Sequence, residues 1–268
     1  YSYKGNDPDG YMSMPEIVDY LKRYAGLTSA PIQSRTLVTS VCRVEGGYEV
    51  TTDHGSWRCR TLVIASGACN IAAVPGLSAE LPRFMVSMAP MDYRNPGQLP
   101  DGGVMVVGAS ATGVQLAREF RASGREVILS AGEHVRLPRV YRDRDIKWWM
   151  DAIGAMDARY DEVDDLDRAR RLPSLQLIGT AERETIDLNS LRKFGVEIVG
   201  RLVGLRDGKA QFSGSLANQC ALADLKMNRL LSNIDEWVSA TGQDSQFDAP
   251  CRYEPTNLGP QTRLSMDL

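Results

Sequence analysis

Histidine and cysteine are scarce in this sequence, and neither is arranged to hold a metal ion. The 268 residues include two histidines, His54 and His134. The five cysteines form no CxxC pair and are Cys42, Cys59, Cys69, Cys220 and Cys251. Zinc sites combine Cys and His at short, regular spacings, so no metal site is predicted. An odd and scattered set of cysteines is typical of reduced thiols in a cytoplasmic protein.

The sequence also lacks a strong charge of either sign and a long apolar run. Lys and Arg number 31 against 34 Asp and Glu, so the net charge of -3 gives no basic footprint for nucleic acid. The longest uncharged run, residues 61–79, is interrupted by polar residues, glycine and proline. A membrane-spanning helix needs about 20 mostly apolar residues, and no apolar signal peptide opens the sequence. We therefore expect a cytoplasmic protein with no membrane span and no nucleic acid partner.

The composition is that of an ordinary globular protein, with 43% hydrophobic and 24% charged residues. At about 150 residues per domain, the length favours two domains. The sequence opens on Tyr1 rather than on Met, and residues 264–268 resemble the beginning of a strand. We therefore expect this chain to be an internal piece of a longer protein.

The first hundred residues predict a helix, a small antiparallel sheet and a linker. Ser13 fits a helix N-cap, and apolar residues then recur at helical spacing as far as Gly26. Residues 62–65 are continuously apolar, which is typical of a buried strand. Prolines between residues 75 and 100 predict a linker. Short strand-like runs separated by turns predict a meander with strands at 37–44, 48–52 and 58–64.

The remaining sequence predicts alternating strands and helices. A strand, a glycine-bounded turn, a helix and a second strand are predicted over residues 104–130, and residues 140–172 are charged and predict helix. Beyond them we expect a short helix at 188–194, a strand at 196–199, a hairpin around Asp207-Gly208 and an amphipathic helix at 216–240. The apolar stripe predicted for that last helix comprises Leu225, Leu230, Leu231, Ile234 and Trp237.

The turn after the first of these strands carries a specific chemical signal. Gly108-Ala109-Ser110-Ala111-Thr112-Gly113 follows the dinucleotide-binding pattern G-x-G-x-x-G, with Ser110 in the middle glycine position. Gly108 permits a sharp turn, position 110 must be small so that the backbone can approach a pyrophosphate, and Gly113 lets helix and strand pack closely. The helix start offers N–H groups and a positive dipole end to phosphates. The alternative is a turn whose glycines serve geometry alone.

The end of the second strand indicates which nicotinamide cofactor to expect. Enzymes that use NAD usually place Asp or Glu there to bind the ribose hydroxyls. This sequence has Ser130, followed by His134, Arg136 and Arg139. A hydroxyl and two guanidinium groups suit a 2′-phosphate, because arginine binds phosphate oxygens in a bidentate way. NADPH is therefore favoured over NADH; in the alternative, Glu133 binds the ribose and the arginines are surface charges.

Five stretches of the sequence together resemble the flavin-containing monooxygenase-like flavoproteins, a broad group with two dinucleotide-binding sites. Residues 3–13 are similar to the group's segment before the meander, and residues 62–67 to its hinge strand. Residues 104–117 resemble its NADPH-binding phosphate loop. Residues 145–150 and 201–212 resemble stretches of a bacterial subset of the group. The resemblance covers the chain nearly end to end.

The resemblance implies an oxidoreductase that depends on NADPH and FAD and is monooxygenase-like. NADPH would pass a hydride to FAD, and O2 would then be activated for oxygen transfer to a small organic substrate. The flavin carries this chemistry, so the resemblance assigns no catalytic side chain. Ser66 and Gly67 lie where the hinge would approach the flavin and the nicotinamide.

Two features of the sequence depart from the group's pattern. The glycine motif that binds the FAD pyrophosphate in the group does not occur here. The fingerprint FxGxxxHxxx(W/Y) is not intact either, because residues 84–93 contain no histidine. A flavin reductase or oxidase without oxygen transfer therefore remains an alternative, as does a non-catalytic module that senses pyridine nucleotides. The 268-residue chain by itself is expected to lack enzymatic activity.

The expected fold is α/β, with a Rossmann-like NAD(P)-binding domain inserted in an incomplete FAD-binding domain of the two-dinucleotide-binding type. Residues 1–97 would form the partial FAD-binding domain and residues 98–240 the NADP-binding domain. Residues 241–268 would return to the FAD domain. The sequence does not name the substrate, and it leaves a homodimer open.

Overall fold

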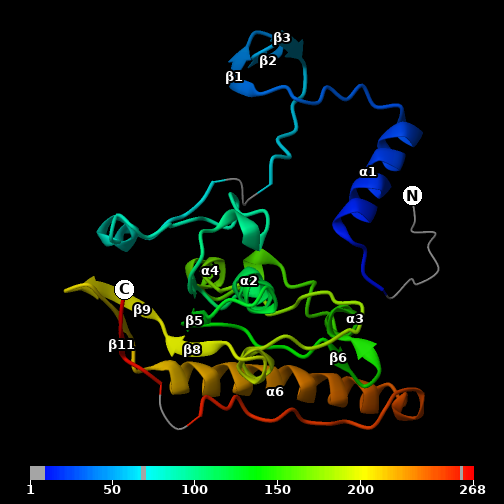
Figure 1. The fold of residues 1–268 in the computed structure, drawn as a ribbon. Coiled ribbons are helices and arrows are strands. Elements are labelled where there is room, and N and C mark those ends of the chain that lie inside the picture. The colour runs from blue at the N-terminus through cyan, green and yellow to red at the C-terminus, as the bar shows by residue number, and fades with distance from the viewer. Residues whose placement is uncertain (1–9, 68–70, 260–261) are drawn as a thin grey trace. The chain divides into compact units, whose positions relative to one another are not determined.

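The computed structural model describes residues 10–67, 71–259 and 262–268, and its contacts divide the chain into two units, Tyr1–Ala72 and Ala73–Leu268 (Figure 1). Cys69 and most of the 3–13 stretch lie outside the described residues. No helix in the described ranges has the length and apolar character needed to cross a membrane. The predicted functional division at residues 97 and 240 stays a prediction.

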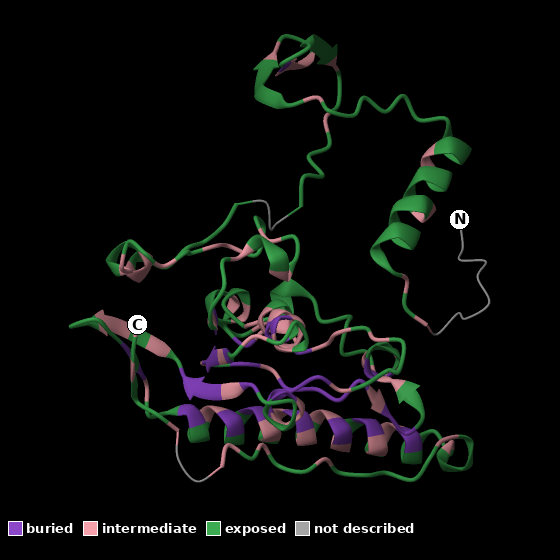
Figure 2. Ribbon diagram, in the orientation of Figure 1, coloured by how far each residue is buried: buried purple, intermediate pink, exposed green. Residues whose placement is uncertain are grey.

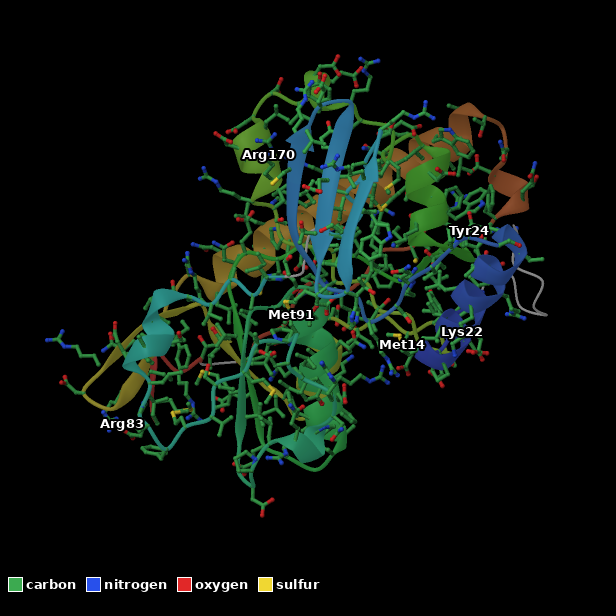
Figure 3. The ribbon with its side chains drawn as sticks, turned by 90° about the horizontal axis from the view of Figure 1, so that it is seen from above. Met14, Lys22, Tyr24, Arg83, Met91 and Arg170 are labelled. Atoms are coloured by element: carbon green, nitrogen blue, oxygen red, sulfur yellow. The ribbon has the colours of Figure 1, made fainter. Side chains whose placement is uncertain are left out.

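The first unit contains one helix and a small sheet. α1 (Met14–Thr28) begins at Ser13, whose backbone N–H and hydroxyl donate to the Glu16 carboxylate at 2.6 and 2.7 Å. No residue of α1 is buried, and Figure 3 shows Met14 and Tyr24 on its surface. The predicted meander is confirmed as an antiparallel sheet in chain order, formed by β1 (Val38–Val44), β2 (Gly47–Thr52) and β3 (Gly55–Cys59). The bounds predicted for its third strand, residues 58–64, are wrong, because β3 begins and ends earlier.

The buried strand predicted at residues 62–65 is wrong for this structure. β3 ends at Cys59, and Val63 and Ile64 are 82% and 78% exposed. A strand that is apolar on both faces is stable between hydrogen-bonded neighbours that cover it. Within residues 10–67 the three strands of the meander pair with one another, and none pairs with this stretch. The apolar run is therefore irregular and exposed.

A parallel sheet forms the centre of the second unit. Its strands are β4 (Val104–Val107), β5 (Val127–Ala131) and β8 (Glu197–Gly200), in that order. α2 (Ala111–Ala122) provides the crossover that two parallel strands need between β4 and β5. α5 (Leu188–Lys193) leads into β8, which pairs with β5. The strands and helices predicted over residues 104–130 and 188–199 are confirmed.

The two faces of this sheet are covered by different layers. Val106, Leu129 and Ile198 pack with α2 and α5 in one core cluster. On the other face, Met105 and Ile128 pack against a second, antiparallel sheet. That sheet consists of the predicted hairpin, β9 (Leu202–Arg206) and β10 (Lys209–Phe212), and of β11 (Ser265–Asp267). These three layers confirm an α/β fold of the Rossmann-like kind.

The long helix α6 (Leu216–Ala240) has the predicted bounds, and its apolar stripe is confirmed in part, because Leu231 and Ile234 are buried. Leu225, placed in the stripe by the sequence pattern, is 47% exposed. Figure 1 shows α6 running along the strands on the side away from α2, and Figure 2 shows its buried face turned towards them. The carboxyl half of this face packs with Tyr141, Ile146 and Trp149. The buried stripe comprises Leu216, Cys220, Ala223, Met227, Leu231, Ile234 and Val238.

The helix predicted over residues 140–172 is interrupted, so that prediction is wrong in its extent. A hairpin of β6 (Val140–Tyr141) and β7 (Arg144–Asp145) comes first, because Arg142 and Asp143 adopt positive φ angles of 45° and 64°. Two short helices follow, α3 (Ile146–Ala152) and α4 (Leu166–Arg170). The remaining elements are 3-10 turns, η1 (Gly76–Glu80), η2 (Pro96–Gln98), η3 (Tyr160–Glu162) and η4 (Asp244–Gln246).

Candidate functional site

The turn between β4 and α2 lies at the carboxyl end of the parallel sheet. Gly108 has a φ of +107°, a backbone conformation that L side chains rarely adopt. Its N–H donates to the Ser130 carbonyl at 2.9 Å and so ties the turn to β5. A Cβ on Gly113 would lie 1.8 Å from the Gly108 carbonyl oxygen. Both positions therefore require glycine, for the sharp turn and for the close approach of helix to strand.

The amino end of α2 is open at this same edge. Ser110 is the N-cap residue, and its side chain makes no capping hydrogen bond. Val114 is the first residue whose N–H reaches a carbonyl of the helix turn, that of Ser110 at 3.1 Å. The N–H groups of Ala111, Thr112 and Gly113 precede it and have no acceptor within the helix. Three backbone donors at the positive end of a helix form a suitable place for an anion.

Gln176 fixes this turn from a distant part of the chain. Its side chain is 1% exposed, and its Nε2 donates to the Ala109 carbonyl at 2.6 Å. Its own backbone N–H donates to the Val135 carbonyl at 2.9 Å. Sequence reasoning missed Gln176, because a single glutamine that contacts the turn across 67 positions leaves no local pattern. Among the described residues, three buried side-chain atoms lack a hydrogen-bond partner: Gln176 Oε1, His134 Nε2 and Asn228 Oδ1.

Ser130, at the end of β5, stabilises the sheet rather than facing solvent. It is 1% exposed. Its hydroxyl donates to the Gly200 carbonyl at 3.0 Å and accepts from the Leu202 N–H at 2.9 Å. These two bonds hold the segment between β8 and β9 against the end of β5. The hydroxyl would have to leave both partners to reach a cofactor phosphate.

The predicted arginines are buried and already paired with carboxylates. Arg136 is 4% exposed and lies 2.7 Å from both Asp187 Oδ2 and Asp224 Oδ1. Arg139 is 5% exposed, and its Nε donates to Asp145 Oδ2 at 2.8 Å. A phosphate would have to displace these carboxylates from the guanidinium groups. The alternative that these arginines are surface charges does not describe them either.

His134 is buried beside the same strand end. Its Nδ1 lies 2.9 Å from the Gly132 carbonyl, and its side chain is 2% exposed. Burial lowers the pKa of His134, because the charged imidazolium loses its hydration, although the Gly132 carbonyl opposes the shift. The adjacent Glu133 is exposed and pairs with Lys226 at 3.4 Å. His134 is thus suited to remain neutral at physiological pH.

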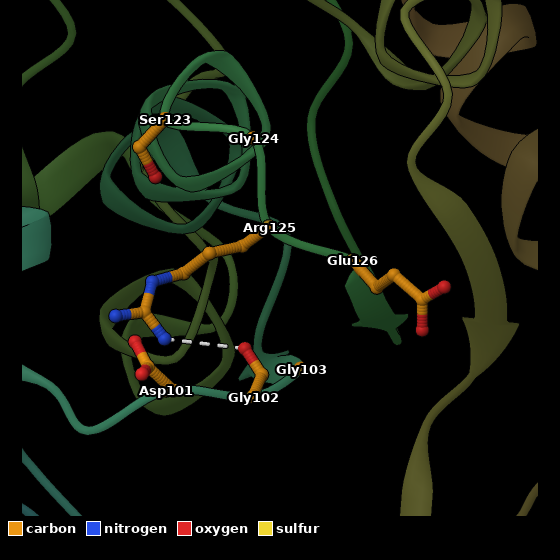
Figure 4. Close-up of a pocket in the computed structure, with 7 residues that line it drawn as sticks. All are labelled: Asp101, Gly102, Gly103, Ser123, Gly124, Arg125 and Glu126. Carbon is orange, nitrogen blue, oxygen red and sulfur yellow. Dashed lines mark hydrogen bonds between the residues drawn. The ribbon is translucent and has the colours of Figure 1, made fainter.

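Two further features do not belong to the turn. Ser66 and Gly67, predicted to approach the flavin, are exposed residues of the first unit. A surface pocket of the second unit, formed by residues 101–103 and 123–126, lies at the amino ends of β4 and β5 (Figure 4). There Arg125 Nη1 donates to the Gly102 carbonyl at 3.1 Å. Ligands of open α/β sheets bind at the carboxyl ends of the strands, so this pocket is not the candidate site.

Known proteins match this chain in sequence. The family model described as pyridine nucleotide-disulphide oxidoreductase matches residues 4–152, more than half of the chain. The chain belongs to this oxidoreductase family. The matched part includes both glycines of the turn, β4, α2 and β5.

Two curated relatives match this chain over part of their length. An uncharacterized CzcO-like oxidoreductase from Geobacillus kaustophilus is 34% identical over 152 residues, 56% of this chain and 43% of the relative. The uncharacterized oxidoreductase CzcO from Bacillus subtilis is 31% identical over 154 residues, 58% of this chain and 45% of the relative. The match to this chain thus spans less than half the length of these curated relatives.

A solved structure shows the same fold. A mutant flavin monooxygenase from Stenotrophomonas maltophilia superposes with a TM-score of 0.51 and 17% sequence identity, over 76% of this chain and 53% of that chain. With the family match, this confirms the resemblance to flavin monooxygenase-like FAD/NAD(P)-binding oxidoreductases. The fold class predicted from the sequence is confirmed with it.

Proposed function

We propose that this chain binds NADPH at the 108–113 turn and belongs to a flavin-dependent oxidoreductase. The observation that carries the proposal is the Gly113 contact, where no Cβ fits between α2 and the Gly108 carbonyl. This closeness brings the amino end of α2 to the carboxyl end of β4. A dinucleotide diphosphate binds at such a position in Rossmann-like folds.

The residues of the turn fit a diphosphate. The N–H groups of Ala111, Thr112 and Gly113 would donate to its oxygens, and the small Ser110 would let the backbone approach it. Gln176, through the Ala109 carbonyl, would keep these donors in place. When bound, NADPH supplies a hydride, and the chain's own residues hold and orient the nucleotide that carries it.

FAD is proposed as a cofactor of the whole protein rather than of these residues alone. The sequence contains one glycine motif of the dinucleotide-binding type, and the turn it forms accounts for one dinucleotide. We propose that the whole protein transfers hydride from NADPH to FAD and uses O2 on a small organic substrate. Support for this comes from the family match and from the fold shared with a flavin monooxygenase.

Calorimetric titration of the 268-residue chain with NADPH and NADH tests the nucleotide assignment. We expect one NADPH per chain and weaker binding of NADH. No binding of either nucleotide would remove the basis of the proposal, and tighter binding of NADH would overturn the preference for NADPH.

A matched pair of variants at Thr112 tests the position of the diphosphate. Thr112 is exposed in the first turn of α2, where an acidic side chain is compatible with the helix dipole. Thr112→Glu should therefore leave the fold intact and weaken NADPH by at least about 10-fold, because it places like charges together. Thr112→Gln has nearly the same size without the charge and should bind close to wild type. Equal binding by both variants would place the diphosphate elsewhere.

A further inference from the structure

The proposed NADPH site needs a cation at the carboxyl end of β5, because the adenosine ribose lies there in Rossmann-like folds. Arg136 and Arg139 are buried and paired with carboxylates, and the Ser130 hydroxyl bonds to backbone groups. We propose that Arg201, which sequence reasoning did not select, recognises the 2′-phosphate of NADPH. This inference rests on the proposed function and names the residue that sets its cofactor preference.

The backbone fixes Arg201 at the required edge of the sheet. Arg201 lies between β8 and β9, and the Ser130 hydroxyl bonds to the residues on either side of it, Gly200 and Leu202. Its own carbonyl accepts from the Ser213 N–H at 2.9 Å. β5 and β8 are parallel neighbours, so residue 201 follows β8 where residue 132 follows β5.

The Arg201 side chain lies beside Gly132, the first residue after β5. A Cβ at Gly132 would be 3.5 Å from Arg201 Cβ and Cγ and 3.6 Å from its Cδ. The methylene groups of Arg201 therefore lie along the backbone that leads from β5 to Glu133. In a Rossmann-like fold, this is the segment that faces the adenosine ribose.

The charges at this position favour an anion. Arg201 is exposed, and no ion pair between residues that the structure describes uses its guanidinium. The neighbouring Glu133 carboxylate is paired with Lys226 at 3.4 Å. Lys226 thus balances the charge of Glu133, and the guanidinium of Arg201 adds a positive charge to this edge of the sheet. An exposed guanidinium can bind a phosphate in a bidentate way without first breaking a buried ion pair.

The test compares Arg201→Gln with wild type by titration with NADPH and with NADH. NADPH should bind about 10- to 100-fold more weakly to the variant, the range for a lost charged hydrogen bond. NADH lacks the 2′-phosphate, so its affinity should change by less than about 2-fold. Arg201→Lys retains the charge but not the planar guanidinium that donates two parallel hydrogen bonds, so it should show an intermediate loss of NADPH affinity.

Arg206→Gln is the matched control, because Arg206 is an exposed arginine at the other end of β9, paired with Asp207 at 3.6 Å. It removes the same charge and should leave both affinities unchanged. The role of Arg201 would be overturned if both glutamine variants lost NADPH affinity equally, or if Arg201→Gln lost affinity for both nucleotides equally. Unchanged NADPH affinity in Arg201→Gln would also overturn it. If wild type prefers NADPH and Arg201→Gln keeps that preference, the Arg201 assignment alone fails. If wild type binds neither nucleotide, the proposed function fails with it.

Discussion

The close approach of α2 to the end of β4 at Gly113 allows a quantitative prediction. In the variant Gly113→Ala, the added Cβ would lie 1.8 Å from the Gly108 carbonyl oxygen and 2.8 Å from its carbon. Neither atom belongs to a flexible side chain, so α2 must move away from β4. Overpacking costs about 1–3 kcal/mol, and contacts this short with backbone atoms belong to the upper part of that range, about 2–3 kcal/mol. The higher helix propensity of alanine offsets about 1 kcal/mol of it.

We therefore expect Gly113→Ala to lower the free energy of unfolding by about 1–2 kcal/mol. For a chain of this size, that lowers the melting temperature by about 2–8 °C. Urea denaturation followed by circular dichroism measures the loss, and NADPH affinity should fall in the same variant, because the helix donors shift.

Gly103→Ala is the control at the other end of β4. Its added Cβ would be 3.7 Å from the Glu126 carbonyl oxygen, an ordinary contact, so the variant should be no less stable than wild type. A Gly113→Ala protein as stable as Gly103→Ala would refute the tight packing of α2 on β4.

Three further predictions concern buried side chains around the site. Arg136→Met should lower the free energy of unfolding by about 3–5 kcal/mol, because it leaves the buried Asp187 and the partly buried Asp224 without their cation. Urea denaturation measures this loss, and Arg159→Met, which breaks an exposed ion pair, should have no measurable effect. The lowered pKa of His134 means that the unfolded chain takes up a proton first as the pH falls below about 6.5. Wild type should therefore lose more stability between pH 7.5 and 5.5 than His134→Gln, and equal losses would show that His134 does not contribute. Gln176→Leu leaves the buried Ala109 carbonyl without its donor and should lower the free energy of unfolding by about 1–3 kcal/mol. It should weaken the binding of NADPH and of NADH to the same extent. Weaker binding of one nucleotide alone would contradict the role of Gln176 at the turn.

Local patterns in the sequence predict much of the fold correctly. The Asp207-Gly208 turn, α6 and the strand–turn–helix–strand at 104–130 depend on residues close together in the chain. The exposed stretch at 62–65 shows where this reasoning ends. Its apolar composition is typical of a buried strand, but burial depends on neighbouring strands that a local pattern cannot reveal.

The candidate site likewise has features that the sequence predicts and features that it does not predict. The geometry of Gly108 and Gly113 is predictable, because backbone requirements determine which residue fits. The environment of Arg136 is not, since the carboxylates that pair with it lie 51 and 88 positions away. Arg201 was overlooked for a similar reason, because β8 is next to β5 in the sheet but is separated from it in the sequence by residues 132–196.

Hydrogen–deuterium exchange of the chain with and without NADPH tests the central claim most directly. If the diphosphate binds the amino end of α2, backbone amides in residues 108–114 should exchange more slowly when NADPH is present. The amides of residues 101–103 and 123–126, at the opposite end of the strands, should be unaffected. Slower exchange around that second set, with none in 108–114, would contradict the account.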